Sequence, residues 1–96
     1  MFESIIVNQR FVRALGLKPA YLLFALMDKY RPEWGKYYDI NFIDISDDIA
    51  IGWGDSAEAL EVLIEAELVK VIDSNVDYIK DVAFIPDNFD DILKCF

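Results

Sequence analysis

The chain has 96 residues, enough for one modest hydrophobic core and too few for a catalytic domain together with a regulatory one. It carries 18 acidic and 9 basic residues, a net charge of −9, and this surface is unsuited to a nucleic-acid backbone or an anionic membrane. Histidine is absent, which removes the commonest general acid–base and metal ligand and with them most hydrolase and metalloenzyme functions.

Hydrophobic residues make up 55% of the chain and the mean hydropathy is +0.24, which is high for a small domain. We therefore expect some apolar surface to meet a partner. The lone Cys95 and the lack of an Asn-x-Ser/Thr sequon favour a reducing, cytoplasmic setting. Residues 1–10 lack a basic leader and an unbroken apolar run, so they resemble neither a signal peptide nor a membrane span.

The first regular element is a helix from about Lys18 to Tyr30, where apolar residues recur at steps of three and four. Pro19 suits its first turn and Pro32 ends it. A short helical or extended lead over residues 11–15 precedes it.

The middle of the chain alternates between short elements and turns. We expect an aromatic loop over residues 33–38 and, from the apolar–polar alternation, a very short strand over residues 41–45. A brief helix over residues 46–51 would follow, with Ser46 as its N-cap. Gly52-Trp53-Gly54 would then form a tight turn.

The best-defined helix begins at Asp55, which stands three residues before Glu58 as in a capping box. Its periodicity predicts a buried stripe composed of Ala57, Leu60, Leu63, Ile64 and Leu68. Two strand-like runs over residues 68–73 and 78–84 follow, joined by a four-residue hairpin loop, 74–77.

A short amphipathic helix introduced by Pro86 ends the chain. Its apolar side consists of Phe89, Ile92, Leu93 and Phe96. This stripe has two interpretations: it covers the core of its own chain, or it pairs with a second copy in a homodimer.

This order of elements is that of the winged helix-turn-helix. The predicted fold class is therefore α+β, with three or four helices, a small antiparallel β-hairpin wing and a short C-terminal helix. We expect a single domain over residues 1–96, with its core in 1–84 and the amphipathic helix in 85–96.

Three segments carry a resemblance to a known family: Ile-Ile-Val-Asn at residues 5–8, Ala-Leu-Gly-Leu-Lys-Pro-Ala at 14–20, and the helix-to-strand run at 59–69. Together with the aromatic loop, they resemble the N-terminal winged-helix domain of phage and plasmid replication-initiator proteins. The resemblance covers roughly residues 5–84. It implies the fold, a DNA-related history and an origin in a phage or other mobile element.

The chain departs from this family in its charge. DNA-reading members carry basic or hydroxyl residues near the start of the recognition helix. The matching helix here exposes Asp55, Glu58, Glu61, Val62 and Glu65. Residues 39–67 contain nine acids and no base, whereas residues 1–36 have a net charge of +3. This face would repel a duplex.

We therefore expect a non-catalytic protein that binds a protein partner with a basic surface through its acidic helix-turn-helix. The candidate binding residues are Asp47, Asp48, Trp53, Asp55, Glu58, Glu61 and Glu65. Trp53 is either an aromatic anchor for the partner or a core residue.

One version of this hypothesis is DNA mimicry. Glu58, Glu61 and Glu65 rise about 4.5 to 6 Å from one to the next along a helix, which is of the order of phosphate spacing. Phage-encoded inhibitors of restriction or CRISPR nucleases are similar in being small, acidic and free of catalytic residues.

The alternative function is a DNA-binding transcriptional regulator or replication accessory that contacts phosphates through its basic N-terminal third. The residues available for this are Arg10, Arg13, Lys18, Arg31, Lys36 and Lys80. These bases are scattered and could instead pair with nearby acids. The wing loop 74–77 also contains no base.

An enzyme is the weakest interpretation. Asp47-Asp48 and Asp90-Asp91 are paired carboxylates, but each pair is expected at a helix start, where the dipole favours acids. The sequence contains no Gly-rich phosphate loop or nucleophile motif, and we expect no cofactor and no metal.

Overall fold

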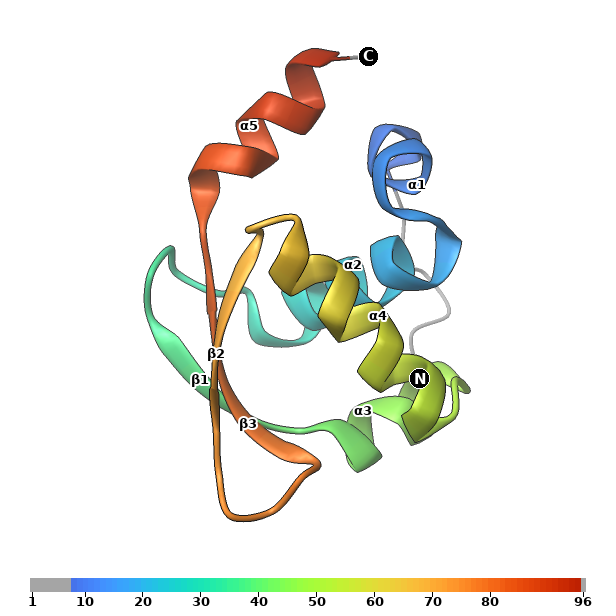
Figure 1. The fold of residues 1–96 in the computed structure, drawn as a ribbon, viewed down its shortest axis with the longest axis vertical. Helices are drawn as coiled ribbons and strands as arrows, with labels where there is room; N and C mark the ends of the chain where they lie inside the picture. The colour runs from blue at the N-terminus through green and yellow to red at the C-terminus, as the bar shows by residue number, and fades with distance from the viewer. Residues whose placement is uncertain (1–7, 96) are drawn as a thin grey trace.

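The computed structural model describes the backbone of residues 8–95 and the side chains of residues 8–92, with most helices on one face of a small antiparallel sheet (Figure 1). The elements in chain order are α1 Gln9–Leu15, α2 Leu17–Tyr30, β1 Tyr37–Asn41, α3 Phe42–Ile49, α4 Trp53–Glu65, β2 Val69–Asp73, β3 Ile79–Phe84 and α5 Pro86–Cys95. This α+β arrangement of the described residues is compatible with a winged helix.

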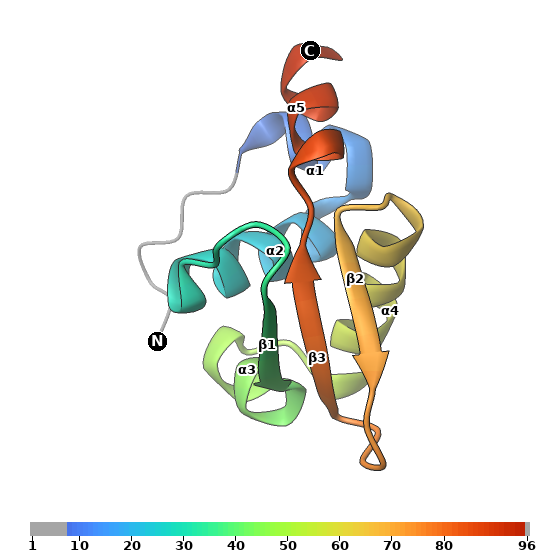
Figure 2. The ribbon, with the colours of Figure 1, turned by 90° about the vertical axis from the view of Figure 1, so that its left-hand side faces the viewer.

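The sheet has the strand order β1-β3-β2, so that β3 lies between two edge strands within the described residues (Figure 2). Register places Tyr38, Val82 and Val71 in one row across its core face. That face and helices α1 to α4 enclose the largest fully buried side chains, which are Phe11, Phe42, Phe84, Leu22, Leu23, Leu26, Ile40, Ile45, Leu63 and Leu68.

The predictions for the helix from about Lys18 to Tyr30 and for the two strands after α4 are confirmed. Helix α2 spans Leu17–Tyr30, and the lead before it is the short helix α1, which Asn8 caps by accepting from the Arg10 N–H at 2.8 Å. Gly16, at φ 96°, separates the two helices with a conformation that disfavours L side chains. Strands β2 and β3 also lie where the sequence predicts them.

The predicted strand over residues 41–45 is wrong. Strand β1 ends at Asn41, whose side chain accepts from the N–H groups of Ile43 and Asp44 at 3.0 and 3.3 Å and so caps helix α3. The alternation that indicated a strand also fits a helix, because Phe42, Ile45 and Ile49 recur at steps of three and four and are buried.

Ser46 is buried in the middle of α3, so its predicted role as an N-cap is wrong. Its hydroxyl donates to the carbonyl of Phe42 and shares a hydrogen bond of 2.8 Å with the hydroxyl of Ser56 in α4. Since Ser46 has a single O–H, Ser56 donates in this second bond. The pair ties α3 to α4 inside the core.

The turn between α3 and α4 lies earlier than predicted. Ala50 adopts a left-handed conformation at φ 56°, and the Ile51 N–H donates to the Ser46 carbonyl at 3.1 Å. Helix α4 begins directly afterwards at Trp53 with Gly52 as its N-cap, so the predicted tight turn at 52–54 is wrong. Asp55 consequently lies in the first turn of the helix and is not its cap.

The buried face of α4 is also rotated from the predicted one. Its buried residues are Ser56, Ala59, Leu60 and Leu63. Ala57 is half-buried and Ile64 is exposed, which corrects two members of the predicted stripe, while Leu68 is buried just beyond the helix. The predicted stripe contained only apolar residues, so it did not include Ser56, which is polar and buried.

Helix α5 packs on the chain's own core through Phe89. This side chain is 6% exposed, and its ring lies 5.4 Å from that of Phe11 and 5.1 Å from that of Trp34. Ile92 is half-buried against the same core. The core-covering interpretation is therefore correct for these two residues, whereas the Leu93 side chain and Phe96 lie outside the described residues, and a homodimer stays a prediction.

Candidate protein-binding face

The candidate site is built on helix α4. Glu58, Glu61 and Glu65 follow one another at steps of three and four on its exposed surface, so their carboxylates form one stripe. Among the residues that the structure describes, no ion pair within 4.0 Å involves these three glutamates. Their charge is therefore directed to solvent and is available to a partner.

The remaining carboxylates of the candidate set lie closer to bases. Asp55 pairs with Lys18 at 3.1 Å, and Asp48 pairs with Lys29 at 3.2 Å. The two lysines stand near opposite ends of α2, about 16 Å apart along its axis at 1.5 Å per residue. The structure therefore separates Asp48 from the α4 stripe, and the seven predicted residues do not form one compact cluster.

Burial raises the pKa of the Tyr30 hydroxyl above its ordinary value of 10.0. Lys29 opposes this shift in pKa, and the nearby carboxylates of Asp39, Asp44 and Asp48 reinforce it. Three carboxylates therefore act on the end of α2 that carries Tyr30, together with the opposing charge of Lys29.

Three carboxylates of the site lie in the last turn of their helices, and only Asp48 has a base as partner, Lys29; Asp47 and Glu65 occupy unfavourable positions without one among the described residues. Asp47 lies in the last turn of α3 and Glu65 ends α4, and neither helix has a base in its last turn. The negative end of the helix dipole repels a carboxylate there. Asp47-Asp48 was predicted at the start of a helix, and this is wrong because both residues lie in the last turn of α3. Asp90-Asp91 was also predicted at a helix start, and it lies inside α5.

Neutralising these two positions is expected to stabilise the fold. Each of Asp47→Asn and Glu65→Gln should raise the free energy of unfolding by about 0.3–1 kcal/mol at low ionic strength. Asp44→Asn is the matched control, because Asp44 lies in the first turn of α3 and its neutralisation should destabilise. Urea unfolding at low and high salt measures whether each substitution raises or lowers the free energy of unfolding. Equal changes for Asp44→Asn and Asp47→Asn would contradict the dipole argument.

Trp53 packs against the core and is partly exposed, and its predicted role as an anchor for a partner stays a prediction. It is half-buried, and its ring lies 6.0 Å from that of the core residue Phe42. It also lines an open hollow between α4 and β2 together with Leu60, Ile64 and Val71. The indole thus packs on the core and leaves part of its surface open to solvent.

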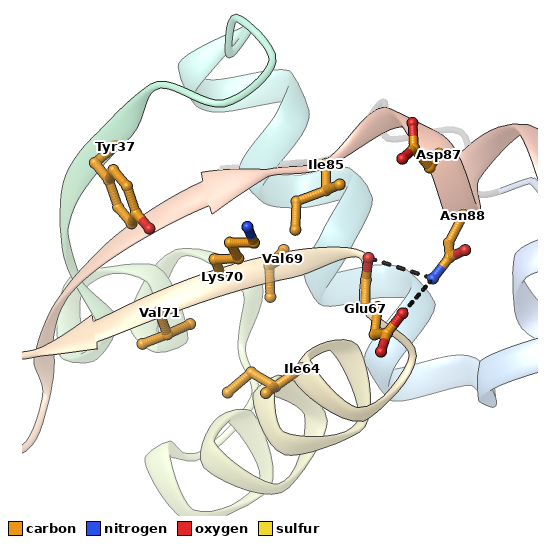
Figure 3. A pocket seen from close by; sticks show the side chains of 9 residues that line it. All are labelled: Tyr37, Ile64, Glu67, Val69, Lys70, Val71, Ile85, Asp87 and Asn88. Atoms are coloured by element: carbon orange, nitrogen blue, oxygen red, sulfur yellow. Dashed lines mark hydrogen bonds between the residues drawn. The ribbon is translucent and has the colours of Figure 1, made fainter.

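A second hollow continues the first along β2, and the two share Ile64 and Val71. Figure 3 shows this second part, where Ile64 of α4 and Val71 of β2 lie near each other and Glu67 meets Asn88 at the start of α5. We call the two hollows together the α4–β2 groove. This groove was not predictable from the sequence, since only the packing of α4 against the sheet brings its two walls together.

The bases of the alternative DNA-binding function do not gather on one surface. Lys18 and Lys80 pair with acids, Lys80 with Asp73 at 2.6 Å. Lys36 lies 5.6 Å from the ring of Tyr38. Arg10 and Arg13 belong to α1, and Arg31 follows α2. The bases are thus divided among helices α1 and α2, the loop over residues 31–36 and strand β3.

The part of the chain that the structure describes has no group of three or more His, Cys, Asp or Glu side chains that could hold a metal ion. None of its helices is both long and apolar enough to cross a membrane. Comparison with family models, with curated proteins and with solved structures finds no match. The resemblance to replication initiators therefore stays a prediction.

Proposed function

We propose that this chain is a non-catalytic winged helix-turn-helix protein that binds a partner protein with a basic surface through the exposed carboxylates of α4. The observation that carries the proposal is the stripe formed by Glu58, Glu61 and Glu65, which meets no cation within ion-pair distance among the described residues. A surface of this kind attracts a basic protein and repels a phosphate backbone.

The placement of Asp47 and Glu65 supports the same function. Both carboxylates stand where the helix dipole opposes them, so they lower the stability of the fold. Residues that lower stability are often retained because a binding or catalytic function needs them. The acidic surface is thus better explained by a partner than by the needs of folding.

The test is affinity capture from a lysate of the organism that encodes the chain. The variant carries Glu58→Lys, Glu61→Lys and Glu65→Lys. The matched control carries Asp28→Lys, Asp90→Lys and Asp91→Lys, at exposed positions outside α3 and α4. Each substitution raises the net charge by two, so each set changes it from −9 to −3. The two variants therefore differ in where the charge is reversed and not in how much.

We expect the wild type and the control to retain the same salt-sensitive protein, and the α4 variant to lose it by 100-fold or more in affinity. Like charges juxtaposed in an interface cost several kcal/mol, and about 2.7 kcal/mol corresponds to 100-fold. Circular dichroism verifies that all three chains are folded. Equal retention by the folded α4 variant and the control would exclude the acidic face as the binding surface.

Fluorescence anisotropy of a labelled random duplex tests the alternative function. We expect no binding at high micromolar protein at about 50 mM salt, because the bases are dispersed and partly paired. Binding that falls steeply between about 50 and 200 mM salt would instead establish phosphate contacts. If the captured protein is itself a nuclease or DNA-binding protein and duplex DNA competes for it, the DNA-mimic form of the proposal holds.

A further inference from the structure

Strand β2 presents an open backbone edge. It pairs with β3 on one side. The Ile85 N–H donates to the Leu68 carbonyl at 3.0 Å, and this bond shows which residues of β2 direct their backbone groups to β3. The backbone groups of successive residues alternate in direction along an antiparallel strand, so the N–H and C=O groups of Lys70 and Ile72 bond to β3 and those of Val69, Val71 and Asp73 point away from it. Val69 is only 2% exposed, so Val71 and Asp73 are the residues that present these groups to solvent. No hydrogen bond to these outward groups occurs among the described residues.

The α4–β2 groove follows this open edge and supplies an apolar floor. The side chains of Val69 and Val71 lie on the core face of the sheet, the same side as α4. Beside them are Ile64, which is 36% exposed, and the half-buried Trp53. A strand added to β2 would place alternate side chains over this floor.

Carboxylates stand at both ends of the groove. Glu61 and Asp77 lie at the wing end, together with Asp73, whose carboxylate pairs with Lys80. Glu67 and Asp87 lie at the other end, near the start of α5. Lys70 also borders this end, but its side chain rises on the face of β2 away from Ile64 (Figure 3). Both ends of the groove therefore favour cationic groups of a ligand, and the middle of the groove favours apolar ones.

We infer that the partner binds by adding an extended segment to the edge of β2, and that this segment has an apolar middle and basic residues at both ends. The inference rests on the proposed function and specifies how the acidic protein engages its partner. Backbone hydrogen bonds to Val71 and Asp73 supply affinity, and the apolar floor and acidic ends select the segment.

Charge argues against a second copy of this chain as the occupant. Antiparallel pairing of two β2 strands about Val71 places Asp73 of one copy opposite Val69 of the other. This pairing brings the wing end of one groove to the α5 end of the other, and both ends carry carboxylates. A basic segment from another protein meets no such repulsion.

The test uses the full chain and a synthetic peptide, Lys-Arg-Val-Thr-Val-Thr-Val-Arg-Lys, with Glu in place of every basic residue as the control peptide. Amide hydrogen exchange is followed by NMR. We expect the basic peptide to slow exchange at Val71 and Asp73 at least tenfold, and the acidic peptide to have no effect. Lys70 and Ile72 provide an internal reference, because their amides already bond to β3.

Two variants separate the groove from the rest of the acidic face. Val71→Pro removes an N–H that points to the open edge, a position where a strand tolerates proline. Ile64→Lys charges the floor, and Ile43→Lys, at a residue of similar exposure on α3, is its matched control. We expect Val71→Pro and Ile64→Lys to weaken peptide binding at least tenfold and Ile43→Lys to leave it unchanged.

The results that overturn the inference are distinct from those that overturn the proposed function. Strand addition is excluded if the peptide binds and leaves the Val71 and Asp73 amides unprotected, or if both peptides have the same effect. The capture experiment from lysate tests the acidic face separately. A wild type that sediments as a dimer and a Val71→Pro variant that sediments as a monomer would assign the edge to a second copy.

Discussion

Replacing Phe42 by alanine is expected to lower the free energy of unfolding by about 3–5 kcal/mol, a large part of the 5–15 kcal/mol typical of a domain. Phe42 is fully buried at the point where β1 becomes α3. Its N–H donates to the Tyr78 carbonyl at 2.7 Å, its carbonyl accepts from Ser46, and its ring faces Trp53. The truncation therefore leaves a cavity at the junction of the sheet with both helices.

Urea unfolding followed by circular dichroism measures this loss. Phe42→Leu is the conservative control, because it retains most of the volume and should cost clearly less than alanine. The backbone bonds of residue 42 remain in both variants, so the difference between them reports packing alone. A loss below about 1 kcal/mol for Phe42→Ala would show that the side chain does not fill the core in this position.

The second large effect is expected at Phe89, where alanine should also cost about 3–5 kcal/mol. The ring contacts Phe11 and Trp34 and attaches α5 to α1 and to the loop before β1. Because these contacts lie within one chain, the loss should be the same at all protein concentrations. An interface between two copies would instead give a midpoint that rises with concentration.

Thermal unfolding over a 100-fold range of protein concentration distinguishes these cases. Asp90→Ala, at an exposed neighbouring position of α5, is the control and should stay within about 0.5 kcal/mol of the wild type. A Phe89→Ala variant as stable as this control would show that α5 does not depend on the core. An unfolding midpoint of the wild type that depends on protein concentration would indicate that Phe89 lies in the interface of the predicted homodimer.

Long or strongly patterned segments were predictable from the sequence. Helix α2 has a repeated apolar spacing with proline at each end, and the hairpin runs β2 and β3 alternate around a polar loop. The acidic character of α4 was also predictable, since residues 39–67 contain no base wherever the helix begins. These properties depend on residues close together in the chain, so local rules suffice for them.

Short segments with ambiguous patterns were not predictable. Residues 42–45 fit both a strand and a helix, and the choice follows from the cap supplied by Asn41 and from burial of Phe42 and Ile45 between other elements. Ser46 has the composition of an N-cap, yet it becomes a core residue because Ser56 of another helix supplies its partner. A local pattern cannot reveal a partner ten residues away.

The sequence by itself determined which residues carry the charge of this protein, its α2 helix and its hairpin. Only the tertiary structure decided which carboxylates are paired by Lys18 and Lys29, that Ser56 completes the buried side of α4, and that Ile64 and Val71 border one groove beside an open strand edge. Charge and periodicity are properties of neighbouring residues. Pairing, burial and a shared groove depend on distances between segments far apart in the chain, which packing alone establishes.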